Sequence, residues 1–268
     1  MGFGFGIRLT TSKLSSEVNP FASLMSILLS GAAQLIAHPL EYGSMFQDRA
    51  GTTPVTAPGQ LVGHCLDAGP GGYHATAISD AARGVFREVD GIRYIEYNGV
   101  NTAYSTPALP APLVDKAQVF AGQRKDGASS SNRAIINQNL QDSPSFSLRA
   151  PDFLGNNYGL FFRGSGAIQA ISSLNTFPPP HIGVLSGIID LSGSAVLRVN
   201  GAQIATVISN SVVNFGAFPL FLGSFSNNTG FFNGRHYATL GPITRFSAAN
   251  ATPQQIEAAE AYYTARVI

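Results

Sequence analysis

Three short apolar runs joined by tight turns, in the C-terminal third of the chain, constrain the fold more than any other feature. Residues 182–190 form the first run, and a turn at 191–193 leads into the second run, 195–199. Asn200-Gly201 then leads into the third run, 202–208. A two-residue type I′ turn requires a positive φ at both positions, and Asn-Gly is the pair that adopts this conformation most readily. The pattern predicts consecutive antiparallel strands.

Strand-like runs also occupy the rest of the chain. Residues 93–98 alternate as a half-buried strand does, and Asn98-Gly99 ends the run. Residues 145–148 and 158–163 predict an antiparallel pair. Further strands are expected at 116–123, 219–223 and 232–237. We assign the C-terminal runs to one antiparallel sheet, and the whole pattern predicts an all-β domain.

One helix is predicted, at the C-terminus. Thr252 provides an N-cap hydroxyl, Pro253 stands at the first helical position, and Gln255 completes a capping box. An apolar stripe follows at spacings of three and four, formed by Ile256, Ala259, Tyr263 and Val267. This pattern predicts one amphipathic helix that lies on the sheets.

The chain carries few charges. Only 12% of its 268 residues are Asp, Glu, Lys or Arg, which is about half the usual share. A monomer with so few surface charges dissolves poorly, so we expect partners to cover much of the surface and the chain to form a homo-oligomer such as a trimer. The net charge of +1 provides no electrostatic footprint for nucleic acid, which is therefore not expected as a partner.

The sequence shows no pattern for metal or thiol chemistry. Cys65 is the single cysteine, which excludes an intrachain disulfide and a cysteine-based zinc cluster, and its apolar neighbours predict a core residue. The five histidines are scattered without metal-ligand spacing. Loop Asn and Asp residues suit calcium, but they are also the default residues of turns, the interpretation that we favour. We predict no metal site and no cofactor.

The N-terminal region has the least regular pattern. Residues 1–6 alternate Gly and Phe, and residues 18–40 contain no Asp, Glu, Lys or Arg. Three interpretations of 18–40 stay open: a segment that anchors on another protein, which we favour, a membrane-inserted helix, and an ordinary packed helix. We assign residues 1–37 to an anchoring arm and residues 38–268 to one globular domain. The predicted anchoring residues are Phe3, Phe5, Phe21, Leu24, Ile27 and Leu28.

An ordered set of short motifs spans residues 40–268. The motifs are Met45-Phe46-Gln47-Asp48-Arg49-Ala50-Gly51-Thr52-Thr53-Pro54-Val55, Pro58-Gly59-Gln60, Val62-Gly63, His74-Ala75-Thr76, Arg93-Tyr94-Ile95-Glu96-Tyr97-Asn98-Gly99-Val100, Val199-Asn200-Gly201 and Phe232-Asn233-Gly234-Arg235. In this order they resemble tailed-bacteriophage virion proteins with a concanavalin A-like (LamG-like) domain. The resemblance implies a jelly-roll sandwich of two antiparallel sheets, localisation in the virion, and other virion proteins of the tail, neck or capsid as partners.

Paired carboxylates were considered because concanavalin A-like folds also include glycoside hydrolases, which work with two such groups. Glu88 and Asp90 alternate and would share a strand face. Asp90-Gly91, however, also has the composition of a turn between strands, which we favour. No catalytic residue is therefore predicted.

Carbohydrate binding is expected, if anywhere, in the loop at residues 224–232. Amides lie beside aromatic residues there, and this combination suits sugars. The candidate carbohydrate-binding residues are Asn227, Asn228 and Phe231. In the alternative interpretation, Phe231 and Phe232 are core residues that lead into a strand.

Three functions follow from these patterns. The leading hypothesis is a non-enzymatic structural component of a tailed-phage virion, such as a tail fibre or a capsid decoration, anchored by its N-terminal arm. The second is a receptor-binding lectin that recognises host surface polysaccharide. The third, which we favour least, is a polysaccharide-degrading enzyme that depends on Glu88 or Asp90.

Overall fold

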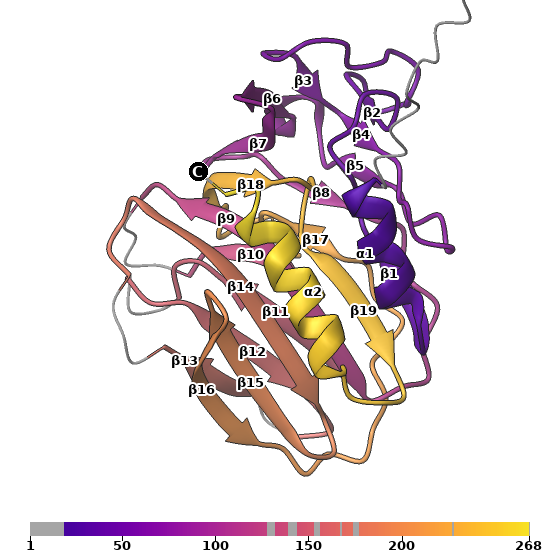
Figure 1. Cartoon of the computed structure of the whole chain (residues 1–268), viewed down its shortest axis with the longest axis vertical. Helices are drawn as coiled ribbons and strands as arrows, with labels where there is room; N and C mark the ends of the chain where they lie inside the picture. The colour runs from indigo at the N-terminus through magenta and orange to yellow at the C-terminus, as the bar shows by residue number, and fades with distance from the viewer. Residues whose placement is uncertain are drawn as a thin grey trace, which may run out of the picture.

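A computed structural model of the chain describes residues 19–127, 132–138, 144–152, 156–166, 168–173, 177–226 and 228–267. Two antiparallel sheets form a sandwich, and two helices cover the outer face of one of them (Figure 1). The all-β prediction with one C-terminal helix is confirmed for the sheets and for that helix. A second helix, near the N-terminus, was left open by the sequence.

The first sheet carries the helices. Its strand order is β16 (Ala202–Ile208), β15 (Ser194–Val199), β14 (His181–Asp190), β9 (Lys116–Lys125), β18 (Asn233–Tyr237), β7 (Ile92–Asn98), β6 (Gly84–Val89) and β3 (Leu61–Val62). Beside β18, strand β19 (Ile243–Ser247) pairs with the other half of β9, and β1 (Ala32–Ile36) pairs with β19.

The second sheet closes the other side of the core. Its order is β13 (Ile168–Ser172), β12 (Gly159–Arg163), β11 (Ser145–Arg149), β10 (Ala134–Asn137), β17 (Phe221–Leu222), β8 (Tyr104–Ser105), β5 (Ala75–Ala77), β4 (His64–Cys65) and β2 (Met45–Phe46). A short 3₁₀ helix, η1 (Asp80–Ala82), precedes β6.

The main core lies between the two sheets. Fully buried side chains from both sheets form it, among them Phe86, Leu185, Leu197, Phe146 and Phe162. Cys65 is also fully buried, which confirms it as a core residue, and burial raises the pKa of its thiol. Burial of apolar area at roughly 25 cal/mol per Å² makes this core the principal source of stability.

The predicted hairpins of the C-terminal third are confirmed in the first sheet. β14 pairs with β15 and β15 with β16, and the turn between the last two has φ of 50° at Asn200 and 80° at Gly201. The assignment of all C-terminal runs to one sheet is wrong. β17 belongs to the second sheet, and β18 lies between β7 and β9. The segment between β16 and β17 is too long for a tight turn, so it does not require β17 to pair with β16.

Helix α2 (Pro253–Thr264) confirms the predicted C-terminal helix. The Thr252 hydroxyl accepts from the N–H of Gln255, and the Gln255 side chain accepts from the N–H of Thr252, which completes the capping box. Ala259 and Tyr263 of the predicted stripe are fully buried. They pack on the outer face of the first sheet together with Phe120 of β9.

Helix α1 (Pro20–Leu29) lies beside α2 on the same face (Figure 1). The Asn19 side chain caps it, accepting from the N–H of Phe21 at 2.9 Å. Three predicted anchoring residues, Phe21, Leu24 and Leu28, are buried against the chain's own α2 and first sheet, and Ile27 is half-buried. Phe3 and Phe5 lie outside the described residues.

Residues 20–36 are therefore packed on the sandwich, as the third interpretation of this segment expects. Across the described ranges, no helix has both the length and the apolar character needed to cross a membrane. The anchoring role and the division of the chain at residue 37 stay predictions, which now depend chiefly on residues 1–18.

Candidate ligand-binding site

The predicted carbohydrate loop is only partly described. Asn227 lies outside the described residues. Asn228 has a φ of 57° and donates its backbone N–H to the carbonyl of Phe225 at 3.0 Å, which is turn geometry. Phe231 is half-buried, and Phe232 is fully buried in the core. The described part of this loop thus serves the turn and the core, and its sugar-binding role stays a prediction.

Glu88 and Asp90, the two candidate catalytic carboxylates, have structural roles. Glu88 accepts from the Tyr42 hydroxyl and from Nε of Arg93, both at 3.1 Å. Asp90 and Gly91 have φ of 51° and 77° and form the turn between β6 and β7, as expected. Within the described ranges, no group of three or more His, Cys, Asp or Glu side chains is arranged to hold a metal ion.

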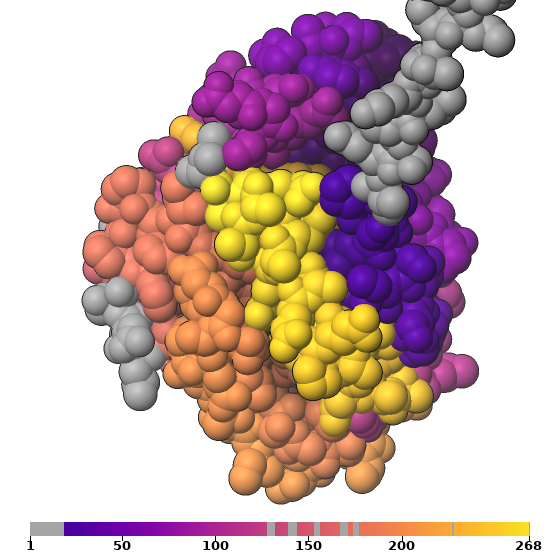
Figure 2. Space-filling view, in the orientation of Figure 1, coloured from indigo at the N-terminus to yellow at the C-terminus, as the bar shows by residue number. Residues whose placement is uncertain are grey.

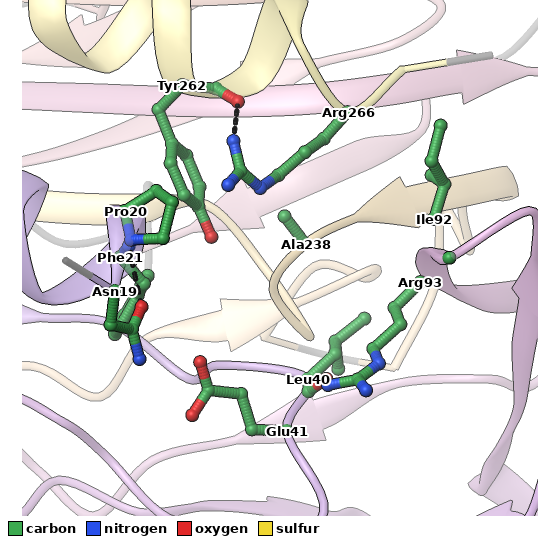
Figure 3. Close-up of a pocket in the computed structure, with 11 residues that line it drawn as sticks. Asn19, Pro20, Phe21, Leu40, Glu41, Ile92, Arg93, Ala238, Tyr262 and Arg266 are labelled. Atoms are coloured by element: carbon green, nitrogen blue, oxygen red, sulfur yellow. Dashed lines mark hydrogen bonds between the residues drawn. The ribbon is translucent and has the colours of Figure 1, made fainter. Parts of the chain in front are cut away.

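A pocket lies where the start of α1, the end of α2 and the β6–β7 turn meet. We call it the polar pocket; its volume is about 200 Å³. Figure 3 shows Tyr262 and Arg266 on one side of it and Glu41 and Arg93 on the other. The pocket is lined by Asn19, Pro20, Phe21, Leu40, Glu41, Gly91, Ile92, Arg93, Ala238, Tyr262 and Arg266.

Arg266 supplies hydrogen-bond donors to this pocket. Tyr262 lies in the last turn of α2, and Arg266 lies two residues beyond the end of the helix at Thr264. Nη1 of Arg266 donates to the Tyr262 carbonyl at 2.8 Å, and the guanidinium lies 4.0 Å from the centre of the Tyr262 ring. These contacts hold the guanidinium over the ring, and the described residues engage none of its other N–H groups in a hydrogen bond or ion pair.

Glu41 supplies an acceptor from the opposite side. No hydrogen bond or ion pair to its carboxylate is made by any residue that the structure describes. Burial raises the pKa of the Tyr262 hydroxyl to about 12, with Glu41 adding to the rise and Arg266 opposing it. Tyr262 is therefore a neutral phenol at physiological pH, able to donate and to accept a hydrogen bond.

Arg93 is fixed more tightly than Arg266. It pairs with Glu88, and its guanidinium lies 4.8 Å from the centre of the Tyr42 ring. Tyr42 is 42% exposed and directly follows Glu41, so an accessible aromatic ring stands beside the polar pocket. The surroundings of the pocket thus combine a free acceptor, a free donor and two aromatic side chains.

The sequence interpretation did not find this site. Its residues come from five segments of the chain, and each is ordinary in its own segment. The local signals were the Asn19-Pro20 cap and the spacing of Tyr262 and Arg266, but neither indicates a ligand without the fold.

Solved structures share this fold. The chain matches the binding domain of Paraclostridial Mosquitocidal Protein 1 with a TM-score of 0.58 at 9% identity, covering 89% of this chain and 52% of that one. It matches the botulinum neurotoxin serotype G binding domain with a TM-score of 0.52 at 11% identity, over 87% and 51%. The chain has the fold of a jelly-roll sandwich of two antiparallel sheets.

A third structure is similar over its whole length. Domain 4 of AbnA, a GH43 extracellular arabinanase from Geobacillus stearothermophilus, was solved in complex with arabinotriose. It matches with a TM-score of 0.54 at 13% identity, over 76% of this chain and 100% of that one. The chain spans about half the length of the two toxin binding domains. No protein-family model and no curated protein matches the sequence, and the resemblance to tailed-phage proteins gains no support from these comparisons.

Proposed function

We propose that this chain is a non-enzymatic, lectin-like module that binds carbohydrate in the polar pocket. The observation that carries the proposal is the free Glu41 carboxylate on one side of the pocket, with the Arg266 guanidinium and the Tyr262 ring on the other (Figure 3). Support also comes from the fold, which the chain shares with a domain solved in complex with arabinotriose.

A sugar ring matches this set of groups. Each hydroxyl group both donates and accepts a hydrogen bond, so neighbouring hydroxyls can donate to Glu41 and accept from Arg266. Hydrogen bonds to charged groups are about twice as strong as neutral ones. A volume of about 200 Å³ equals roughly seven water molecules at about 30 Å³ each, which suits one ring rather than a long oligosaccharide.

The same geometry favours binding over hydrolysis. Glycoside hydrolases need two carboxyl groups about 5 to 10 Å apart on either side of the scissile bond. Among the described residues that line the polar pocket, Glu41 is the single carboxylate. The carboxylate of Glu88, the other candidate for a catalytic acid, already accepts hydrogen bonds from Tyr42 and Arg93.

A glycan array with the full chain tests the proposal. We expect retention of a defined set of glycans, and at least a tenfold loss of affinity in Glu41→Gln and in Arg266→Gln, because each removes a charged hydrogen-bond partner. The matched controls are Glu257→Gln on the exposed face of α2 and Arg87→Gln on β6, which should bind normally. The proposal fails if the array shows no binding, or if the pocket variants bind as the controls do.

A virion structural component is the second candidate. The motif order across residues 40–268 favours it, and so does the uncharged edge strand β16, whose end exposes 73% of Ile208. Residues 1–18 would anchor the chain to the particle, and the sandwich would project from it.

Deletion of residues 1–18 tests the anchor better than a longer deletion. Removing residues 20–36 as well would take away α1 and β1, which pack on the sandwich. We expect the shorter deletion to leave a folded domain that is absent from purified particles of the encoding phage. Normal incorporation of this protein, seen by labelling its C-terminus and imaging particles, would exclude the anchoring role.

A further inference from the structure

A second cavity adjoins the polar pocket. It lies between α1 and α2, and Figure 2 shows these helices, in indigo and yellow, side by side on one face of the molecule. We call it the apolar groove; its volume is about 350 Å³. It is lined by Pro20, Ser23, Leu24, Ile27, Ala258, Tyr262 and Arg266.

Small residues line the groove on both helices. Ser23 of α1 and Ala258 of α2 have short side chains that leave space between the helices, and the rings of Phe21 and Tyr262 pack with centres 5.9 Å apart. Interior positions of a protein are normally packed without voids. An open apolar groove of this size between two packed helices is therefore a feature with room for a ligand.

The polar pocket and the apolar groove adjoin each other. Pro20, Tyr262 and Arg266 line both, so a molecule that contacts these residues in one cavity can extend a substituent into the other. The chemistry changes along this path. Charged groups line the polar pocket, whereas the groove offers aliphatic side chains and, apart from the shared Arg266 and Tyr262, one hydroxyl, that of Ser23.

We infer that the two cavities form a single site for a carbohydrate that carries an apolar substituent, such as an alkyl or acyl chain. The inference rests on the proposed function, because the sugar occupies the polar pocket. The apolar substituent lies between Leu24 and Ile27 of α1 and Ala258 of α2. A second unmodified sugar fits the groove poorly, because its hydroxyl groups would lose water without gaining partners.

Matched glycosides separate the two contributions. Methyl and hexyl β-glycosides of glucose, galactose, mannose and N-acetylglucosamine differ only in the alkyl group, and their affinity for the full chain can be measured by calorimetry or ligand-observed NMR. Each fully buried methylene multiplies affinity by roughly four. With part of the chain buried, we expect at least one hexyl glycoside to bind ten times or more tighter than its methyl counterpart.

Two variants locate the gain. Ile27→Gln, in the groove, should return the hexyl glycoside to the affinity of the methyl glycoside and leave the methyl glycoside unchanged. Glu41→Gln should weaken both. Leu29→Gln is the matched control, because Leu29 is an exposed apolar residue of the same helix outside the groove, and it should change neither. A thermal unfolding curve for each variant confirms that it is folded.

The outcomes are distinguishable. Equal affinity for methyl and hexyl glycosides overturns the inference and leaves the proposed function standing. Hexyl binding that Ile27→Gln abolishes but Glu41→Gln does not change shows a tail bound without its sugar, which overturns the single site. If none of the hexyl glycosides binds, the inference fails, and the glycan array alone decides whether the chain binds other sugars.

Discussion

The guanidinium of Arg245 donates from Nε to the carbonyl oxygen of Leu28 at 2.8 Å, so a residue of β19 caps the end of α1 across a separation of 217 positions in the chain. Nη2 of the same side chain donates to the carbonyl of Ser30 at 2.7 Å. The last carbonyls of a helix have no partner within the helix, and a positive charge there also complements the helix dipole. Arg245 is only 2% exposed, so these bonds are shielded from water.

Replacing Arg245 with Met should detach α1 from the sheet. The change removes the hydrogen bonds to the Leu28 carbonyl and to the side-chain oxygen of Gln118, whereas the Ser30 carbonyl keeps a bond from Nε2 of Gln255. We expect the free energy of unfolding to fall by about 3 kcal/mol. Chemical denaturation measures the loss, and limited proteolysis should show new cleavage between α1 and β1. Arg87→Met is the control, since Arg87 makes a half-exposed ion pair with Glu96 that is worth at most about 1 kcal/mol. Equal losses in the two variants would contradict the capping role.

Gly122 of β9 should not tolerate a side chain, because it lies directly beneath α2. A methyl group at this position would lie 2.6 Å from Cδ1 of Tyr263 and 3.0 Å from Cγ1 of Val267. We expect Gly122→Ala to lower the free energy of unfolding by about 1 to 3 kcal/mol through overpacking. Since α2 carries Tyr262, and Arg266 lies two residues beyond its end, any displacement of the helix should weaken glycan binding in the folded protein.

Gly166→Ala is the matched control for this prediction. Apart from its chain neighbours, no heavy atom of the described residues lies within 4 Å of the corresponding methyl position, so this change should alter the unfolding midpoint little. Thermal unfolding of both variants decides the matter. A Gly122→Ala protein as stable as the control would show that α2 can move away at no cost.

Local signals explain why much of the fold could be predicted from the sequence. Asn200-Gly201 specifies its own turn, and Thr252 and Gln255 specify the start of α2 through bonds within one helical turn. The alternation in β7 and the pairing of β11 with β12 follow from patterns a few residues long. Such features depend on short-range geometry, which is present in the chain before it folds.

The remaining features depend on distant parts of the chain. The Asn19-Pro20 cap and the apolar face of α1 were present in the sequence, but the surface that covers this face comes from β9, β14, β19 and α2. Because the sequence does not show this covering surface, the apolar segment 18–40 is predicted to anchor on another protein. The polar pocket was missed for the same reason, because Glu41 and Arg266 come together only when both ends of the sequence pack on one sheet.

The buried His236 should lower the free energy of unfolding in mild acid. It is buried beside Tyr97 and Phe232, and burial lowers its pKa to about 4, although its hydrogen bond to the Leu240 carbonyl opposes the shift. Between pH 6.5 and 4 the unfolded chain binds a proton at this histidine and the folded chain does not, so stability falls as the pH falls. Over this pH window the difference in proton binding at His236 should lower the free energy of unfolding by about 3 kcal/mol.

The measurement is the free energy of unfolding between pH 7 and 5, where most carboxylates stay ionised. His236→Gln should be less stable at pH 7 and should lose less stability on acidification than the natural chain. His38, whose pKa burial also lowers, should keep part of the acid dependence in this variant. An unchanged slope in His236→Gln would assign the acid sensitivity elsewhere.

We expect the chain to self-associate through the edge strand β16. It carries no charged residue, and it ends the first sheet, where β15 is its only hydrogen-bonded neighbour among the strands that the structure describes. Ile208 is 73% exposed and Val212, just beyond the strand, is 92% exposed. Proteins usually protect such an edge with charges, prolines or a covering segment, so we expect a second copy to pair with β16.

Charged residues should block this pairing. We expect the chain to sediment as an oligomer and Ile208→Lys or Val212→Lys to shift it to the monomer, with thermal stability changed little because both side chains face solvent. Val100→Lys is the matched control, since Val100 is an apolar residue, 71% exposed, in the turn that follows β7. Sedimentation velocity at several concentrations separates the results: a natural chain that is monomeric throughout, or lysine variants that associate as the control does, would exclude β16 as the contact.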